Sequence, residues 1–236
     1  MPADALPSAP SAPSAVMASG PVGALRLLAA FRREQADPDS FYGLLARDSV
    51  ALVARHARLD GSRVVDVSGG AGYFADAFRE HGAQCLLVEP DPAELCIRGA
   101  PSRASVIGDG YWLPLGEASV DVCFSCNVLE HVRDPAGLID EMIRVTRPGG
   151  LVYLSYTVWL SPWRGRRGEK PKNIYGETMF PLSVGQVLSL VRRRADVAVV
   201  EARPRYYPRW CRFLIFLPGL RELLTWNLLL ILRRQA

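Results

Sequence analysis

The sequence predicts an α/β protein built on a mainly parallel β-sheet with helices on both faces. From residue 63 onward, apolar strand-like runs alternate with segments of helical pattern, which is typical of a parallel sheet. The runs are apolar along their whole length, and this indicates strands that are buried on both faces. The first run leads into a glycine-rich turn at residues 68–72 and then into a helical pattern. Such a sheet binds ligands at the carboxyl ends of its strands.

The expected strands follow one another along the chain, with helices between them. We predict strands at 63–68, 84–89, 104–108, 120–126, 151–158, 197–203 and 226–232. We predict helices at 22–35, 40–58, 134–146 and 183–193. The helix at 134–146 is the best marked, because Asp134 can cap it, Pro135 occupies its first position and a Pro-Gly-Gly sequence at 148–150 ends it.

The size and composition of the chain fit one globular domain with a short extension. It has 236 residues, of which 49% are hydrophobic and 22% charged. These values exclude a largely disordered chain, a collagen-like chain and a small disulfide scaffold. Residues 1–20 are rich in Pro, Ala and Ser and make a poor signal peptide, so we predict a disordered tail there. We expect an N-terminal helical cap at 21–60 and the main domain at 61–236.

Five cysteines, an odd number without repeated spacing, argue against a disulfide framework. Cys123 and Cys126 form one isolated pair in an apolar run, so we expect buried, reduced strand cysteines and no metal site. Reduced thiols predict a cytoplasmic protein. No segment reaches the roughly 18 uncharged apolar residues of a membrane-spanning helix. The nearest one, 213–232, contains Pro, Gly, Arg and Glu.

Acidic residues and glycines stand at the ends of the first two predicted strands. Asp66 precedes the turn Ser68-Gly69-Gly70-Ala71-Gly72, where glycine lets the backbone approach a ligand closely. Glu89 ends the second strand 23 residues after Asp66, and a carboxylate there can accept hydrogen bonds from ribose hydroxyls. Gly70, Gly72 and Ala75 also match the G-x-G-x-x-A pattern of dinucleotide sites, so an NAD(P)-dependent reductase is an alternative.

Polar residues also end the third and fourth predicted strands. Asp109 and Gly110 follow the third strand, and Asn127 follows the fourth, shortly before the pair Glu130-His131. The carboxyl ends of parallel strands share one edge of a sheet. We therefore expect these residues to lie near Asp66 and Glu89.

The ordered set of motifs resembles the class I S-adenosylmethionine-dependent methyltransferases of the type 11 small-molecule group. The motifs are VVDVSGGAGYF, LLVEPDP, IGDGYWLPLGEASVDVCFSCNVLEHVRDP and EMIRVTRPGGLVYLSY, spanning about residues 63–157. More loosely, the chain resembles an actinobacterial branch of uncharacterised methyltransferases. The resemblance implies a Rossmann-like, seven-stranded, mostly parallel sheet with an antiparallel last strand and two N-terminal helices. It also implies that 161–236 holds the substrate side and a C-terminal hairpin inserted at the sheet edge.

The resemblance implies S-adenosyl-L-methionine as the cofactor and gives roles to the residues at the strand ends. Asp66 would anchor the ammonium group of the methionine moiety, Glu89 would hold the ribose and Asp109, beside Gly110, would accept the adenine amino group. Ser68, Gly70 and Gly72 would form the loop beneath the cofactor, and Asn127 would line its methionine end. The family usually has glycine where this chain has Ser68, so we expect weaker cofactor binding. Alternatively, Asp66 is a capped loop residue and Glu89 a solvated strand end.

Methyl transfer from a sulfonium mainly needs an aligned nucleophile, and positioning can supply ~7–11 kcal/mol. His131 is the candidate general base, with Glu130 orienting it, because His56 and His81 fall in predicted helices or at their ends. The alternative is that His131 caps or packs at a helix start. Tyr42 is the first choice for an aromatic wall that favours the sulfonium by cation–π contact.

The C-terminal part of the chain is strongly basic. Residues 161–236 carry 15 basic and 5 acidic side chains. Three interpretations compete: a solvated surface, a site for an anionic substrate, and peripheral membrane contact through 203–217, where Trp210, Phe213, Phe216 and Leu217 lie beside arginines. We expect no nucleic-acid partner, because no RNA- or DNA-binding module is visible.

We therefore predict an S-adenosylmethionine-dependent methyltransferase that acts on a small-molecule or lipid-like acceptor. Two alternatives stay open: a protein of the same fold that binds the cofactor without transferring methyl groups, and the reductase. A smaller clue is Asp48, an acid on the apolar stripe of Leu44 and Leu52. It needs a partner, which is either the ligand or an arginine.

Overall fold

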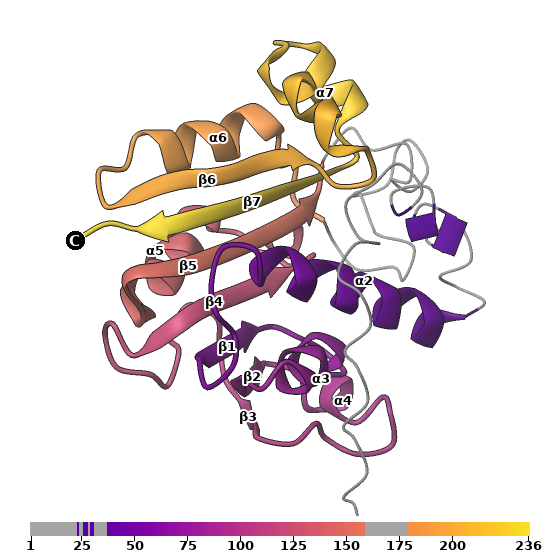
Figure 1. Ribbon diagram of the computed structural model, residues 1–236, viewed down its shortest axis with the longest axis vertical. Helices are drawn as coiled ribbons and strands as arrows, with labels where there is room; N and C mark the ends of the chain where they lie inside the picture. Colours follow the sequence, from indigo (N-terminus) through magenta and orange to yellow (C-terminus); the bar gives the residue numbers. More distant parts are fainter. Residues whose placement is uncertain (1–22, 24–25, 28, 31–36, 159–178) are drawn as a thin grey trace, which may run out of the picture.

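The computed structural model describes residues 23, 26–27, 29–30, 37–158 and 179–236. In these residues the chain forms one seven-stranded sheet with helices on both faces (Figure 1). The predicted tail at 1–20 lies outside the described residues. Of the predicted helix at 22–35, the described residues 23, 26, 27, 29 and 30 are helical.

The sheet has the strand order β3-β2-β1-β4-β5-β7-β6. Its strands are β1 Arg63–Val67, β2 Gln84–Glu89, β3 Ser105–Ile107, β4 Val120–Cys126, β5 Thr146–Thr157, β6 Val197–Pro204 and β7 Asn227–Arg234. The pairs among β1 to β5 are parallel, whereas β7 runs antiparallel to both of its neighbours, β5 and β6. The predicted mostly parallel sheet with an antiparallel last strand is therefore confirmed, and so is the insertion of the C-terminal hairpin.

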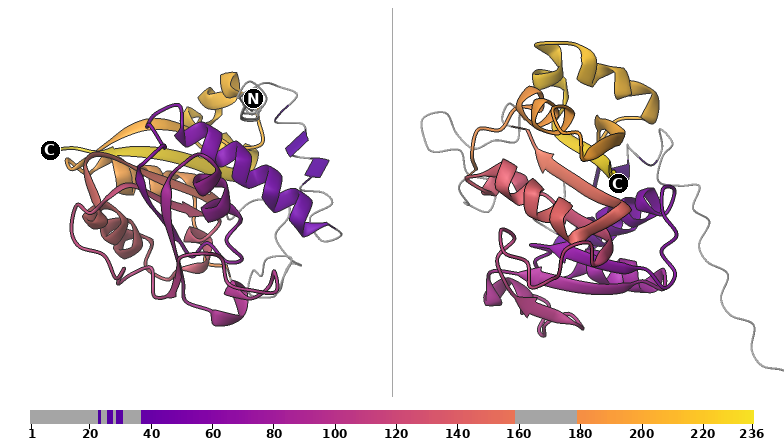
Figure 2. Two further views of the ribbon diagram at one scale, coloured as in Figure 1. Left: turned by 60° about the horizontal axis from the view of Figure 1, so that its bottom comes forward. Right: turned by 90° about the vertical axis from the view of Figure 1, so that its left-hand side faces the viewer.

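The helices lie where the caps in the sequence begin them. They are α2 Pro38–Val53, α3 Tyr73–Glu80, α4 Pro92–Leu95, α5 Pro135–Val145, α6 Val184–Arg192 and α7 Leu220–Leu224, with 3₁₀ segments η1 Leu129–His131 and η2 Arg209–Phe216. Asp134 caps α5 as predicted, accepting a hydrogen bond from the Gly137 amide. Ser183 and Gln186 form a capping box at the start of α6. Figure 2 shows these layers from two further directions.

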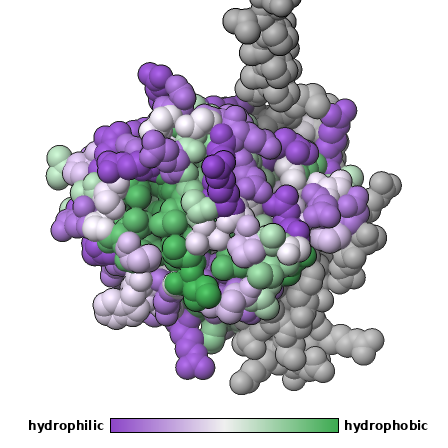
Figure 3. Space-filling view, turned by 90° about the horizontal axis from the view of Figure 1, so that it is seen from below, coloured by the Kyte–Doolittle hydropathy of each residue, from purple (hydrophilic) through white to green (hydrophobic). Residues whose placement is uncertain are grey.

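The two edges of the sheet differ in their surroundings. β3 forms one edge and exposes Ile107. Viewed from below, the corresponding end of the molecule shows an apolar area ringed by hydrophilic residues (Figure 3). β6 forms the opposite edge, and the chain continues from it into η2 and α7. Among the described residues, no helix has the length and hydropathy needed to cross a membrane.

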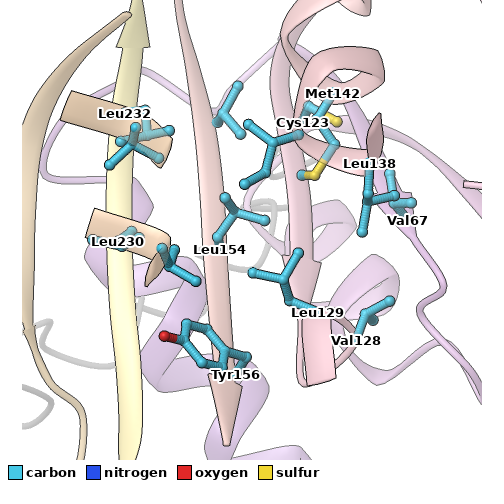
Figure 4. Packing of buried hydrophobic residues seen from close by; sticks show 14 of the residues in the cluster. Val67, Cys123, Val128, Leu129, Leu138, Met142, Leu154, Tyr156, Leu230 and Leu232 are labelled. Atoms are coloured by element: carbon cyan, nitrogen blue, oxygen red, sulfur yellow. The ribbon is translucent and has the colours of Figure 1, made fainter. Parts of the chain in front are cut away.

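Two hydrophobic cores lie on the two faces of the sheet. One packs α5 and α6 against the strands, and includes Leu138, Met142, Leu154 and Leu230 (Figure 4). The other packs α2 and α3 against the opposite face. β7 is buried along its apolar part because it lies between two strands and is covered on both faces. Its position explains the apolar C-terminal sequence.

The end of α5 corrects one prediction. The helix ends at Val145, and β5 begins at once with Thr146, before the Pro-Gly-Gly sequence that we expected to end the helix. Thr146 adopts extended backbone angles and pairs with Val120 across an irregular register. Its hydroxyl donates to the Met142 carbonyl, which satisfies an acceptor in the last helical turn. Sheet pairing, which local sequence signals do not contain, therefore sets this boundary.

Candidate functional site

Asp66 carries a carboxyl group that is buried at the carboxyl end of β1. It lies in β1 and is 1% exposed, and neither of its carboxyl oxygens has a partner within the described part of the chain. Burial raises the pKa of Asp66 from its ordinary 3.8 to about 7; the nearby Ala75 amide opposes this shift, and the Glu89 carboxylate adds to it. Asp66 is therefore not a capped loop residue, and that alternative was wrong. Burying an unpaired carboxyl group destabilises the folded protein, so its presence calls for a functional explanation.

The glycine-rich turn closes around Asp66. A Cβ atom on Gly69 would stand 2.2 Å from Asp66 Oδ2, so only glycine fits at this position. Gly72 is the N-cap residue of α3 and has a φ of +83°, and a Cβ there would lie 2.5 Å from the Ser102 Cβ atom. Close contacts thus require glycine at both positions, and at Gly72 the left-handed backbone conformation favours it as well.

Ser68 occupies a conformation that favours glycine. Its φ is +53°, in the left-handed region, while its amide donates to the Val88 carbonyl at 2.7 Å. The unusual residue of this motif therefore carries backbone strain that glycine would lack. The expectation that Ser68 weakens cofactor binding stays a prediction.

Glu89 joins β2 to the turn. It is 5% exposed, and its Oε2 accepts a hydrogen bond from the Gly70 amide at 2.9 Å. Its Oε1 accepts another from the Asp91 amide at 3.1 Å. The alternative of a solvated strand end was therefore wrong. Asp66, Glu89 and the glycine turn form one cluster, because the turn lies between the carboxyl ends of β1 and β2.

Asp109 and Gly110 follow β3, as predicted. Asp109 is exposed, and its Oδ1 accepts a hydrogen bond from the Tyr111 amide at 2.9 Å. Gly110 is buried against Leu138 and Val67, because a Cβ on it would lie 2.8 Å and 3.1 Å from their side chains. The Asp109 carboxylate thus stands on a fixed turn at the carboxyl end of β3 and is open to a ligand.

Helix α2 brings an aromatic stack to the glycine turn. Tyr42 lies parallel to Tyr73, with ring centroids 5.6 Å apart, and Tyr73 is the first residue of α3, directly after Gly72. The Arg98 guanidinium group lies over the Tyr73 ring, with its Cζ atom 4.5 Å from the ring centroid. The sequence analysis chose Tyr42 but missed Tyr73, although Tyr73 stands within the motif VVDVSGGAGYF.

Asn127 marks the carboxyl end of β4. Its φ is +58°, which asparagine tolerates better than most residues. The backbone N–H of Asn127 donates to the Ser155 carbonyl, and its side-chain oxygen accepts from Asn227 Nδ2 at 2.9 Å. Asn227 is 1% exposed, and its own Oδ1 has no partner among the described residues. The sequence analysis missed Asn227, because the only signal was one amide in an apolar run.

Glu130 and His131 lie in η1, immediately beyond Asn127. Glu130 is 2% exposed, its Oε1 accepts from the Thr157 amide at 2.9 Å, and its Oε2 has no partner in the described segments. Burial raises the pKa of Glu130, and the neighbouring His131 opposes this shift. His131 is half-buried. Together, Glu130 links η1 to the carboxyl end of β5 and holds His131 at the edge that carries Asn127.

Arg203 and Arg205 are buried, so these two cations of the basic C-terminal part do not belong to its exposed surface. Arg205 is 2% exposed and donates to the hydroxyl groups of Tyr153 and Ser49, and its Nη2 lies 3.5 Å from Asp48 Oδ2. Arg203 is 4% exposed and pairs with Glu201 at 2.8 Å. The partner of Asp48 is thus an arginine. Burial raises the pKa of Asp48, and the Arg205 cation opposes this shift.

The five cysteines are unpaired, and both members of the Cys123–Cys126 pair lie buried in β4, as predicted. Burial raises the pKa of the Cys126 thiol to about 11. No group of three or more His, Cys, Asp or Glu side chains in the described residues is arranged to hold a metal ion. The region between β5 and residue 179, which we expected to help form the acceptor side, lies outside the described residues.

Comparisons with known proteins match this geometry to one class of enzyme. Residues 65–154 match a family described as a methyltransferase domain. An uncharacterized methyltransferase of Mycolicibacterium gilvum is 46% identical, over 89% of this chain and 93% of the relative. One of Mycobacteroides abscessus is 43% identical, over 88% of this chain and 92% of the relative. The fold is similar to that of an S-adenosylmethionine-dependent methyltransferase from Mesorhizobium loti, with a TM-score of 0.59 and 23% identity over 80% of this chain and 98% of that one.

Proposed function

We propose that this chain, which belongs to the family of S-adenosylmethionine-dependent methyltransferases, methylates a small-molecule or lipid-like acceptor in the cytoplasm. The observation that carries the proposal is the orphaned Asp66 carboxyl group at the glycine turn. A buried group of this kind costs stability unless a ligand pairs with it. The five unpaired cysteines support a reducing compartment.

The residues at the turn have the chemistry that this cofactor requires. Both carboxyl oxygens of Asp66, which make no hydrogen bond within the described parts of the chain, can accept from a cationic ammonium group. The Glu89 oxygens accept hydrogen bonds from the Gly70 and Asp91 amides, which hold this carboxylate beside the turn, and a carboxylate is an acceptor suited to a ribose hydroxyl. Asp109 is exposed at the next strand end, where it can accept from an adenine amino group. When bound, the cofactor supplies a methyl group on a sulfonium, which is an activated leaving group.

The other predicted residues line the two sides of that position. Tyr42 and Tyr73 cover the turn from α2 and α3. Ser68, Gly70 and Gly72 bring the backbone close beneath it, and Gly110 lets the loop after β3 pack tightly. Asn127, whose side chain accepts a hydrogen bond from Asn227, would line the methionine end. These assignments follow from the motif positions and from the contacts around each residue.

We assign the proton transfer to His131 and its orientation to Glu130. A ring nitrogen of His131 takes the proton from the acceptor hydroxyl or amine as the new bond to carbon forms. Glu130 is held by the Thr157 amide, and the adjacent His131 opposes the rise of the Glu130 pKa, which supports a role for Glu130 in stabilising the imidazolium. The main work of the remaining residues is to align the acceptor with the methyl group.

A first experiment tests the cofactor and the reaction separately. Native mass spectrometry of the purified chain should show S-adenosylmethionine or its demethylated product bound to it. Turnover is then measured as S-adenosylhomocysteine release with a panel of small and lipid-like acceptors. Binding without release across the panel would favour a non-transferring binder, and binding of NADH in place of S-adenosylmethionine would favour the reductase.

The proposed base is tested by His131→Ala. Turnover should fall at least ~100-fold, because general-base catalysis contributes typically 10²–10⁴-fold, while cofactor affinity is retained. The matched control is His81→Ala, which removes an exposed histidine at the end of α3. Equal turnover in His131→Ala and in the control would remove His131 from the mechanism.

A further inference from the structure

The segment that follows β6 exposes large apolar side chains in an ordered row. We call the side chains of Trp210, Phe213, Phe216, Leu217, Leu220 and Leu223 the η2–α7 patch, and their exposed fractions run from 37% to 69%. A 3₁₀ helix has three residues per turn, so Trp210, Phe213 and Phe216 lie along one edge of η2. The opposite side of η2 buries Cys211 and Ile215.

Helix α7 continues this apolar surface. It contains three leucines, and none of its residues is buried. A surface helix of a globular protein usually buries its apolar side chains against the core, whereas the leucines of α7 stay at the surface. Figure 1 shows α7 at one end of the molecule, beyond β6, and Figure 2 shows that this segment projects from the body. The patch therefore lies on a segment that projects beyond the edge strand of the sheet.

The charges around the patch are positive. Arg192 lies over the Phe216 ring, 5.6 Å from its centroid, and Arg212 is exposed within η2 itself. Arg209 is also half-exposed, although it shares the Glu201 carboxylate at 3.7 Å. The one acidic residue of 209–224, Glu222, is turned inward and accepts hydrogen bonds from the amides that begin α6. The η2–α7 patch thus combines exposed aromatic rings with neighbouring arginines, and residues 209–224 contain no exposed carboxylate.

We propose that the η2–α7 patch docks the protein on the surface of an anionic lipid bilayer. Tryptophan and phenylalanine insert at the boundary between headgroups and acyl chains, and leucines add apolar area. Arginines beside them reach the anionic headgroups while their stems stay on the apolar surface. Neither signal alone gives stable attachment, whereas a combined apolar and basic surface does. This inference does not depend on the acceptor of the methyl group.

The η2–α7 patch follows the end of β6 on the side of the sheet that carries the proposed site. The amide of Arg205, at the end of β6, donates to the Asn227 carbonyl at 2.9 Å, and Asn227 in turn bonds to Asn127. The patch begins at Trp210, five residues after Arg205, and β6 ends at Pro204 on the carboxyl edge of the sheet. A bilayer at the patch therefore lies on the side of the molecule that carries the methionine end of the proposed site.

The test is co-flotation of the purified chain with vesicles of phosphatidylcholine containing one quarter phosphatidylglycerol. The protein should float with these vesicles at least ~tenfold more strongly than with phosphatidylcholine alone, and high salt should weaken the binding. Trp210→Ser should reduce the partition coefficient at least ~tenfold. Trp112→Ser is the matched control, because Trp112 is 81% exposed but follows β3 at the opposite edge of the sheet.

Three results would overturn the proposal. One is the absence of wild-type flotation with anionic vesicles at low salt. Another is an equal loss of flotation in Trp210→Ser and Trp112→Ser. The third is a wild-type dimer in sedimentation that Trp210→Ser converts to a folded monomer, with no vesicle binding, since a second copy then covers the patch. The thermal unfolding of each variant verifies that it is folded, and none of these measurements uses methyl transfer.

Discussion

The unpaired carboxyl group of Asp66 makes the stability of the ligand-free protein depend on pH in a specific way. In the unfolded chain this carboxyl titrates near 3.8, whereas burial raises its pKa in the folded protein to about 7. Between these values the folded state holds more protons than the unfolded state. The free energy of unfolding therefore loses up to about 1.4 kcal/mol from this group for each unit of rising pH. Over about three units the loss approaches ~4 kcal/mol.

Asp66→Asn isolates this contribution. The asparagine has nearly the same shape and does not titrate, so the variant keeps any constant cost of a buried polar group but loses the pH-dependent one. The free energy of unfolding of the variant minus that of the wild type should rise steadily from pH 4.5 to about pH 7 and then level off. Urea titrations of the ligand-free proteins at several pH values measure this difference.

A control separates the buried group from a change of net charge. Asp60→Asn removes a carboxylate that is 73% exposed, and its stability difference from wild type should vary little over the same pH range. A difference for Asp66→Asn that stays constant from pH 4.5 to pH 8 would refute the reasoning, because Asp66 would then not hold a proton in the folded state.

The same titration connects stability to cofactor binding. An ammonium group pairs with the ionised form of Asp66, so binding must release the proton that the free protein holds below pH 7. Calorimetry at pH 6 in two buffers of different ionisation enthalpy should show nearly one proton released on S-adenosylmethionine binding. Affinity should rise about tenfold per pH unit below pH 7, and Asp66→Asn should remove this rise along with most of the affinity. No proton release at pH 6 would mean that Asp66 does not receive the ammonium group.

Two further variants test the strain and the buried charge of the site. Ser68→Gly should relieve about 1–2 kcal/mol of left-handed strain against about 0.5–1 kcal/mol of added chain entropy, so the melting temperature should rise by about 1–4 °C; a lower melting temperature would contradict the strain. Arg205→Leu should cost about 3–5 kcal/mol in urea titrations, because it leaves Asp48 buried without its cation. Adding Asp48→Asn should recover part of this loss, and simple additivity of the two changes would show that they do not interact.

The strands and caps could be predicted because their signals are local. Strands buried on both faces need apolar residues at every position, and this gave β1, β2 and β4 to within about one residue of their observed ends. Asp134 announced the start of α5 because a cap acts on the backbone within one helical turn. The order of acidic residues and glycines was also visible, because each stands directly after a strand.

The misses in the site all involve partners that are distant in sequence. Asn227 belongs to the site because it donates a hydrogen bond to Asn127, which is 100 positions away. Tyr73 belongs to it because its ring stacks on Tyr42. Arg205 is one of the basic residues counted in the C-terminal part, yet it packs against α2, 157 positions from its partner Asp48. A composition or a local pattern contains the charge of an arginine but not the carboxylate that neutralises it.

The burial of these arginines also changes how the basic C-terminal part can act. With Arg203 and Arg205 in the core, the exposed cations at the η2–α7 patch are few, and each contributes only about 1 kcal/mol at an anionic surface. Burial of a large apolar side chain contributes about 1.5–3 kcal/mol, and Trp210 exposes 69% of its surface. Trp210→Ser should therefore weaken vesicle binding more than Arg212→Gln, whose loss should be about fivefold. A larger loss of vesicle binding in Arg212→Gln than in Trp210→Ser would mean that charge, and not insertion of the η2–α7 patch, holds the protein at the bilayer.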